Sequence, residues 1–277
     1  MSGNYLSQGA RLSFSDAGSG LPVVLLHPTP LDGEYWRPLT KELAGIRAIV
    51  PDLRGHGHSE LGSGLPAGGF ARVPGAPTLT MARLATDILA LLDHLGVTKA
   101  VFGGCSIGGY VLLELWRRAP QRMRGMIFVC SKPQPDAETN LAKRVETIGR
   151  AGAEGVATLF DEMAQNTVAP SVRRERPEVV GEVRAQMTLT AEALVAVQAG
   201  LAARPDSVPT VATIRVPVLA IAGAEDTSVT AADMEVFHAA PGGCEFHVLQ
   251  GAGHYASYEQ PKKVAALMAP WLRQFEE

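Results

Sequence analysis

The chain has 277 residues, of which 46% are hydrophobic and 19% charged, and its formal net charge is −3. This composition is typical of a folded globular protein and excludes a disordered chain. The small negative charge favours neither nucleic acid nor an anionic membrane surface as a partner. No apolar run approaches the roughly 18 residues of a membrane span, and the polar segment 1–20 lacks the apolar stretch of a signal peptide. We therefore expect a cytoplasmic protein with no membrane partner.

The first half of the chain alternates predicted strands with predicted helices. A hairpin is expected at Arg11–Asp16 with the residues before it, and the segment 61–78, rich in glycine and proline, is expected to be a surface excursion outside the core. Continuous apolar runs predict buried strands at Val23–Leu26, Arg47–Pro51, Ala100–Phe102 and Met126–Cys130. Helical spacing predicts helices at Glu34–Leu43, Leu79–Gly96 and Tyr110–Arg118.

The second half of the chain begins with a long block that has no strand-like run. Helices are expected there at Leu141–Ala151, Val156–Met163, Val179–Met187 and Ala191–Leu201. The alternation then resumes with strands at Val218–Ala222 and Cys244–Leu249 and helices at Ala231–Ala239 and Lys262–Phe275. We predict an α/β fold with a mostly parallel sheet covered by helices on both faces. Residues 1–132 and 210–277 are expected to form its core, and residues 133–209 a helical cap over the carboxyl ends of the strands.

One serine lies in the most informative motif of the chain, Gly104-Cys105-Ser106-Ile107-Gly108. This G-x-S-x-G pattern follows a predicted strand and precedes a predicted helix. A serine on such a sharp turn has an exposed hydroxyl, and its small neighbours allow the strand and the helix to approach closely. We therefore predict that Ser106 is a catalytic nucleophile.

Two further loops after predicted strands carry the partners that a serine nucleophile needs. Asp226 follows the strand at 218–222, and His254 follows the strand at 244–249, so both are expected at the same sheet edge as Ser106. A neutral imidazole takes the serine proton, and a carboxylate on the other ring nitrogen fixes the tautomer and stabilises the imidazolium. The chain order serine, aspartate, histidine is that of hydrolases with this topology.

The tetrahedral intermediate of such a reaction also needs two backbone N–H donors. Ile107, the residue after the nucleophile, is expected to supply one of them. The other is expected from the loop His27-Pro28-Thr29-Pro30, where Thr29 is the only residue of Pro28-Thr29-Pro30 with an N–H. We predict that His27 orders this loop.

Several residues have competing interpretations. Glu225 and Asp52 are rivals to Asp226, although we expect Asp52 to brace the loop around Arg54. His56 and His58 form an H-x-H pair without a nearby third ligand, which favours structural histidines over a metal site. The cysteines Cys105, Cys130 and Cys244 have no C-x-x-C spacing, so we expect buried thiols, with neither a disulfide framework nor a metal ion. The run Arg173, Arg174 and Arg176 is expected to face solvent, with recognition of an acidic substrate group as the alternative.

Taken together, these motifs make the chain resemble the α/β-hydrolase family over nearly its whole length. The matching segments are His27-Pro28-Thr29-Pro30, Asp52-x-Arg54-Gly55-x-Gly57-x-Ser59, Gly104-x-Ser106-x-Gly108-Gly109, Gly223-x-x-Asp226 and Gly253-His254. The resemblance implies eight strands with a helical lid, Ser106 as nucleophile, Asp226 as acid and His254 as base. It is closest to small cytoplasmic carboxylesterases, lactonases and cofactor-free haloperoxidase-like members. The chain departs from the family at Pro28, where glycine is usual, and at Val229-Thr230, where a proline often follows the acid.

The sequence therefore predicts a cofactor-independent serine hydrolase that cleaves small carboxylic esters through an acyl-enzyme. An enol-lactonase or a hydrolase of carbon–carbon bonds with the same triad is the main alternative. A non-catalytic ligand-binding protein on the same scaffold is a lesser one, because fold alone does not fix function. The expected partner is a small ester or lactone, and both a monomer and a homodimer are compatible with the sequence.

Overall fold

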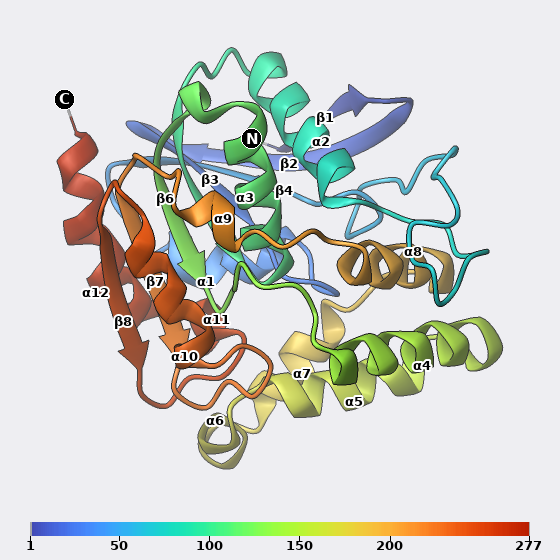
Figure 1. The fold of residues 1–277 in the computed structure, drawn as a ribbon. Coiled ribbons are helices and arrows are strands. Elements are labelled where there is room, and N and C mark those ends of the chain that lie inside the picture. The colour runs from blue at the N-terminus through green and yellow to red at the C-terminus, as the bar shows by residue number, and fades with distance from the viewer. Residues whose placement is uncertain (1, 277) are drawn as a thin grey trace.

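A computed structural model describes residues 2–276, and within them eight strands form one sheet (Figure 1). The strands are β1 (Ser2–Ser7), β2 (Ala10–Gly18), β3 (Leu21–Leu26), β4 (Ile46–Pro51), β5 (Ala100–Cys105), β6 (Met123–Val129), β7 (Val218–Gly223) and β8 (Cys244–Leu249). Their order in the sheet is β1-β2-β4-β3-β5-β6-β7-β8. Strand β2 pairs antiparallel with β1 and β4, and every pair from β4 to β8 is parallel. The predicted hairpin, mostly parallel sheet and α/β fold class are confirmed.

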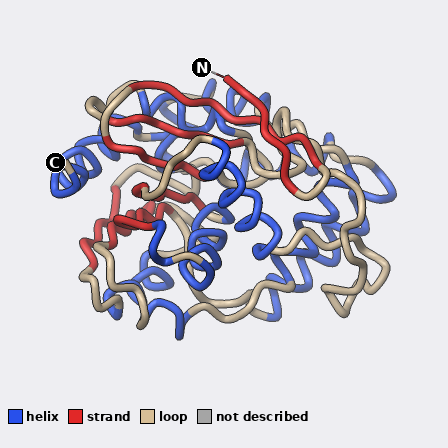
Figure 2. The backbone as a smooth tube through the Cα atoms, turned by 90° about the horizontal axis from the view of Figure 1, so that it is seen from above, coloured by secondary structure: helices blue, strands red, loops and turns tan. Residues whose placement is uncertain are grey.

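Helices cover both faces of this sheet, as the view from above shows (Figure 2). In one group, three helices pack against one another: α1 (Arg37–Thr40), α11 (Ala256–Glu259) and α12 (Pro261–Leu272). The other group comprises α2 (Met81–His94), α3 (Ile107–Arg118), α9 (Val208–Val211), α10 (Ala231–Met234) and the 3₁₀ helix η3 (Glu235–Ala239). Short 3₁₀ helices also occur at η1 (Gly33–Trp36), η2 (Pro120–Arg122) and η4 (Arg273–Phe275). Burial on both faces explains why the central strands β3, β5, β6 and β7 are nearly continuous apolar runs.

Helix boundaries differ from the prediction where capping or a turn decides them. Helix α2 begins after Thr80, whose side chain accepts a hydrogen bond from the N–H of Arg83, as expected of an N-cap. Helix α3 begins at Ile107, three residues before the predicted start, because it continues directly from the turn at Ser106. The helix predicted at 34–43 is instead two short pieces, η1 and α1, and the one predicted at 231–239 divides into α10 and η3.

The block between β6 and β7 is entirely helical, and it gathers beside the sheet away from the C-terminus (Figure 1). Before α9, its helices are α4 (Glu138–Glu154), α5 (Ala157–Thr167), α6 (Pro170–Glu175), α7 (Glu178–Ala185) and α8 (Ala191–Ala202). Of these, α6 was not predicted, since its six residues show too little periodicity. We call residues 133–209 the cap segment, and their status as a separate domain stays a prediction. No helix within residues 2–276 is long and apolar enough to cross a membrane.

The glycine- and proline-rich segment 61–78 differs in one respect from the expected surface excursion. Most of it is exposed, but Phe70 and Ala76 are buried and pack with Ile148 of α4 and Ala199 of α8. The N–H of Leu79 then donates to the carbonyl of Ala196 in α8. This segment therefore forms a small second apolar cluster that joins the cap segment to the core, which its composition does not reveal.

Candidate active site

Ser106 occupies a strained turn between β5 and α3. Its φ of 51° and ψ of −116° are rare for a residue with a side chain, and such strain concentrates at functional sites. The turn is tight because Gly104 lies against the backbone of Gly108, and Gly108 lies against the carbonyl of Leu26 in β3. A Cβ at either glycine would overlap these atoms, which explains the small residues on both sides of the serine.

Asp226 and His254 meet at the carboxyl ends of β7 and β8. Oδ2 of Asp226 lies 2.7 Å from Nδ1 of His254, so the neutral imidazole donates from Nδ1 and keeps Nε2 as its acceptor. Oδ1 of Asp226 accepts the N–H groups of Ser228 at 2.7 Å and Val229 at 3.1 Å. The rival Glu225 points elsewhere and accepts the N–H of Ser171 at the start of α6.

The interaction between Asp226 and His254 shifts the pKa values of both side chains. Burial disfavours the ionised form of Asp226, but the charge and hydrogen bond of His254, with the two N–H donors, outweigh it and lower the pKa of the carboxyl. Burial likewise disfavours the imidazolium, yet the carboxylate of Asp226 reverses this effect and raises the pKa of His254 above its usual 6.5.

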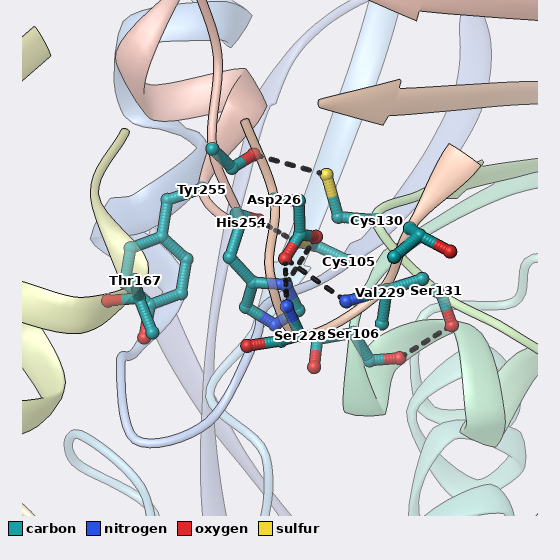
Figure 3. A network of polar contacts seen from close by, with 12 residues as sticks. Cys105, Ser106, Cys130, Ser131, Thr167, Asp226, Ser228, Val229, His254 and Tyr255 are labelled. Carbon is teal, nitrogen blue, oxygen red and sulfur yellow. Dashed lines mark hydrogen bonds and ion pairs between the residues drawn. The ribbon is translucent and has the colours of Figure 1, made fainter. Parts of the chain in front are cut away.

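Ser106 and His254 line one cavity of about 730 Å³, which Thr29 also borders. Figure 3 shows Ser106 together with Asp226 and His254, with Ser131 on the other side of the serine. The hydroxyl of Ser131 donates to the carbonyl of Ser106 at 2.8 Å and so stabilises the turn. The structure thus brings the three residues predicted as a triad to one place, at the carboxyl edge of the sheet.

Glu259 holds the loop of His254, and sequence reasoning missed it. This fully buried carboxylate accepts three backbone N–H groups, from Gly253 and Ala169 on Oε2 and from Tyr255 on Oε1, at 2.9–3.0 Å. Burial raises the pKa of Glu259, while the hydrogen bonds partly oppose that shift. Because Ala169 belongs to the cap segment, the carboxylate joins that segment to the histidine loop. The only available signal was an acidic residue five positions after His254.

The loop that was expected to hold an oxyanion donor is fixed by two buried histidines. Nδ1 of His27 donates to the carbonyl of Pro28 at 2.9 Å, and its Nε2 accepts the N–H of Leu53 at 2.8 Å. Nε2 of His56 accepts the hydroxyl of Thr29 at 2.9 Å, while Nδ1 donates to the carbonyl of Arg54. Burial lowers the pKa of His27 to about 4 and, with the nearby His27, that of His56 to about 3, so both rings are neutral.

The predicted roles of His27 and Asp52 as structural groups are supported by these contacts. Asp52 accepts the N–H groups of Gly33 and His58 and so braces the two loops beside the oxyanion segment. His58 is exposed while His56 is buried, so the H-x-H pair does not converge on one point. Within residues 2–276, no group of three or more histidine, cysteine, aspartate or glutamate side chains is arranged to hold a metal ion.

The three cysteines differ from one another in burial, and so do the three arginines of the run at 173–176. Cys105 and Cys130 are buried, with thiols directed at the carbonyls of His254 and Gly253, whereas Cys244 is only partly buried, contrary to expectation. Burial raises the pKa of all three thiols. Of the three arginines expected to face solvent, only Arg174 is exposed: Arg173 lines the cavity and Arg176 donates to the carbonyl of Glu259.

Comparison with known proteins agrees with this fold. Residues 22–261 match the family described as alpha/beta hydrolase fold. A thermophilic esterase from Thermogutta terrifontis, solved with malate bound, is 32% identical with a TM-score of 0.88 over 99% of this chain and 97% of that chain. The 2-succinyl-6-hydroxy-2,4-cyclohexadiene-1-carboxylate synthase of Salmonella arizonae is 26% identical over 260 residues, covering 92% of this chain and 95% of that protein.

A second curated relative, 3-oxoadipate enol-lactonase 2 of Acinetobacter baylyi, is 28% identical over 220 residues, which cover 77% of this chain and 74% of the relative. The family match covers most of the chain, and the esterase matches almost all of it above 30% identity. The chain therefore belongs to the alpha/beta hydrolase fold family.

Proposed function

We propose that the protein is a serine hydrolase that cleaves small carboxylic esters, with Ser106 as nucleophile, His254 as base and Asp226 as its carboxylate partner. One observation carries this proposal. The Asp226–His254 hydrogen bond of 2.7 Å orients an imidazole toward the same cavity that is lined by a serine in strained geometry. The similarity to the Thermogutta terrifontis esterase supports an ester as the substrate.

The reaction follows from the protonation states at this site. Oγ of Ser106 attacks the ester carbonyl carbon while Nε2 of His254 takes its proton, and the carbonyl π electrons move to the oxygen. Collapse of this tetrahedral intermediate breaks the carbon–oxygen bond, and the imidazolium gives its proton to the departing alcohol. A water molecule then repeats the sequence on the acyl-enzyme: His254 takes one water proton, and the acid leaves as Oγ of Ser106 regains a proton.

The developing oxyanion needs donors that are already in place. Ile107 is the first residue of α3, where a backbone N–H has no acceptor within the helix. Thr29 also lines the cavity, and the hydrogen bond from its hydroxyl to His56 fixes its position. We assign the two N–H groups of Thr29 and Ile107 to the oxyanion, because fixed donors spare the reorganisation that water would require.

A lactone is the second candidate substrate, supported by the similarity to the enol-lactonase of Acinetobacter baylyi. The chemical steps are the same, except that the alcohol and the acyl group stay joined after ring opening. A carbon–carbon bond as the substrate, or binding without catalysis, has no observation of this kind in its favour.

Hydrolysis of 4-nitrophenyl esters from acetate to decanoate by the wild type and by Ser106→Ala tests the proposal. The account predicts turnover of short esters by the wild type and a loss of about 10³-fold or more in kcat in the variant. Parallel assays with γ- and δ-lactones rank the second candidate against the first. Equal ester turnover by both proteins would contradict the role of Ser106.

A further inference from the structure

The cavity beside Ser106 is lined by a mostly buried lysine, Lys132, whose hydrogen-bond donors are not used up. Lys132 is 12% exposed in its side chain, and its Nζ lies 3.5 Å from Oδ1 of Asp233. This separation exceeds the roughly 2.7–2.9 Å of a charge-assisted hydrogen bond. The other oxygen of Asp233 accepts hydrogen bonds from the N–H and the hydroxyl of Thr230 in a capping box. Asp233 therefore caps helix α10 and is not a dedicated partner of Lys132. The ammonium of Lys132 therefore retains donors for a ligand.

The neighbouring carboxylate does not balance Lys132. Asp136 has both oxygens bonded to arginines, Oδ2 to Nε of Arg144 at 2.5 Å and Oδ1 to Nη2 of Arg204 at 2.8 Å. Arg204 is nearly buried and lies over the ring of Tyr110. The side chains that line the cavity include the four cations Lys132, Lys143, Arg144 and Arg173 and the three carboxylates Asp136, Glu225 and Asp233. This leaves an excess of one positive charge in a chain whose net charge is −3.

This excess charge lies in the same cavity as the candidate nucleophile. Ser106, Tyr110, Lys132 and Arg144 all line it. Lys132 directly follows Ser131, whose hydroxyl bonds the carbonyl of Ser106, and Tyr110 lies one turn beyond Ser106 in α3. A group held by Lys132 would therefore belong to the molecule whose ester or lactone bond reaches Ser106.

We infer that the substrate carries a carboxylate, bound by Nζ of Lys132 with Arg144 reinforcing the positive potential. This inference rests on the proposed hydrolase function and names its substrate class, an acidic ester or lactone. A single carboxylate matches the single excess charge, and the mostly buried position of Lys132 limits the screening of the pair by water.

Two matched pairs of substrates test the inference, one for each side of the ester bond. On the acyl side, 4-nitrophenyl hydrogen adipate is compared with 4-nitrophenyl hexanoate, which has the same six-carbon chain without the charge. On the alcohol side, 4-acetoxybenzoate is compared with its methyl ester. The measured quantity is the preference, the ratio of kcat/KM for the anionic substrate to that for the neutral one, in the wild type and in Lys132→Gln.

The inference predicts that Lys132→Gln lowers the preference about tenfold or more in at least one pair, because a charge-assisted hydrogen bond is lost. Lys132→Arg, which keeps the charge, retains more of the preference than Lys132→Gln. Exposed Lys41, outside the cavity, gives a matched control, and Lys41→Gln leaves both ratios as in the wild type. Comparing each variant with the wild type cancels the intrinsic reactivities of the substrates.

Salt provides a measurement that needs no variant. The kcat/KM for the preferred anionic substrate falls as NaCl increases, while that for its neutral partner changes little. A preference that is unaffected by both Lys132→Gln and salt would overturn the inference. Loss of the preference in Arg173→Gln but not in Lys132→Gln would also overturn it, because the contact would then belong to Arg173. If neutral esters are not hydrolysed either, it is the proposed function that fails.

Discussion

Three histidines are buried at the same edge of the sheet, and their pKa values are shifted in opposite directions. His27 and His56, which hold the loop His27-Pro28-Thr29-Pro30, have pKa values lowered to about 4 and about 3. His254, which is also buried, has a pKa raised above the usual 6.5. The difference lies in the partners, since the first two rings bond backbone groups and a hydroxyl, whereas His254 bonds the carboxylate of Asp226.

This contrast shows how one residue type serves two purposes within one site. Burial alone makes a histidine a permanently neutral group that fixes a loop, because it disfavours the imidazolium. A carboxylate partner favours the charged form and raises the pKa of the histidine, as Asp226 does for His254. The sequence distance between the histidines does not reveal this difference, but the hydrogen-bond partners do.

Replacing Asp226 tests most directly whether its carboxylate causes the difference between His254 and the other two histidines. Asp226→Asn is expected to lower kcat for 4-nitrophenyl acetate by about 10³-fold or more, since the amide neither fixes the tautomer nor stabilises the imidazolium. In the wild type, kcat/KM falls as the pH drops through the raised pKa of His254, and in the variant any residual activity falls at a lower pH. Asp52→Asn, which likewise replaces by an amide a carboxylate that accepts two N–H groups, is the control and loses less than about tenfold. Equal effects of the two variants would contradict the assignment.

Glu259 tests whether the position of His254 matters separately from its charge. Glu259→Gln has one oxygen in place of two, so it cannot accept all three N–H groups that the carboxylate accepts. We expect unfolding free energy to drop by about 1–3 kcal/mol and kcat/KM to fall about 10- to 100-fold as the loop shifts. Urea unfolding and ester kinetics measure the two effects. Exposed Glu182, which accepts one hydrogen bond from Tyr258, gives the control Glu182→Gln.

The oxyanion loop is tested by two replacements of one histidine. His56→Asn can keep the donor to the carbonyl of Arg54 but removes the acceptor of the Thr29 hydroxyl, and His56→Gln can keep an acceptor at the position of Nε2. We expect the Asn variant to lose about tenfold in kcat and the Gln variant less, because a loosened oxyanion donor costs less than a missing one. In both variants the acid limb of the pH profile stays where it is in the wild type. A shift of that limb would show that His56 is itself the titrating base.

The pH dependence of the unfolding free energy is the smallest of these effects, and the pKa shifts fix the sign of its slope. Unfolded His56 binds a proton below about pH 6.5, whereas the folded protein binds it only near pH 3, so acid favours unfolding between these values. Relative to His56→Asn, the wild type should lose about 1.4 kcal/mol per pH unit below 6.5. Asp32, with a pKa raised to about 6, and Glu259 titrate in both proteins and cancel in the difference.

For His254 the sign is opposite. Its folded pKa is raised, so its contribution is fully present below pH 6.5 and is lost as the pH rises through the folded value. Urea titrations of the wild type, His56→Asn and His254→Gln from pH 5 to 9 measure both slopes. Slopes of the same sign for the two histidines would contradict the account.

The sheet and the convergence of Ser106, Asp226 and His254 could be predicted from sequence because local patterns encode them. Buried parallel strands are continuous apolar runs, and Ser106 lies between glycines that the tight turn requires. The chain order placed Asp226 and His254 after neighbouring strands, and the structure joins them at 2.7 Å.

Contacts between distant segments were beyond such reasoning. Glu259 accepts an N–H from Ala169, 90 residues away, and His56 accepts a hydroxyl from Thr29, 27 residues away. The burial of Phe70 against the cap segment depends on tertiary packing in the same way, since its neighbours are glycines and prolines typical of a loop. The cationic part of the cavity likewise forms from side chains that only the fold assembles, such as Lys132 and Arg144.

Covalent labelling tests the central claim, that Ser106 is a nucleophile activated by the Asp226–His254 pair. The protein is treated at pH 8 with a fluorophosphonate, and the modified residue is mapped by peptide mass spectrometry in the wild type, Ser106→Ala and Asp226→Asn. The account predicts one adduct per chain on Ser106 in the wild type, none in Ser106→Ala and much slower labelling in Asp226→Asn. Labelling of another residue at the same rate in all three proteins would contradict it.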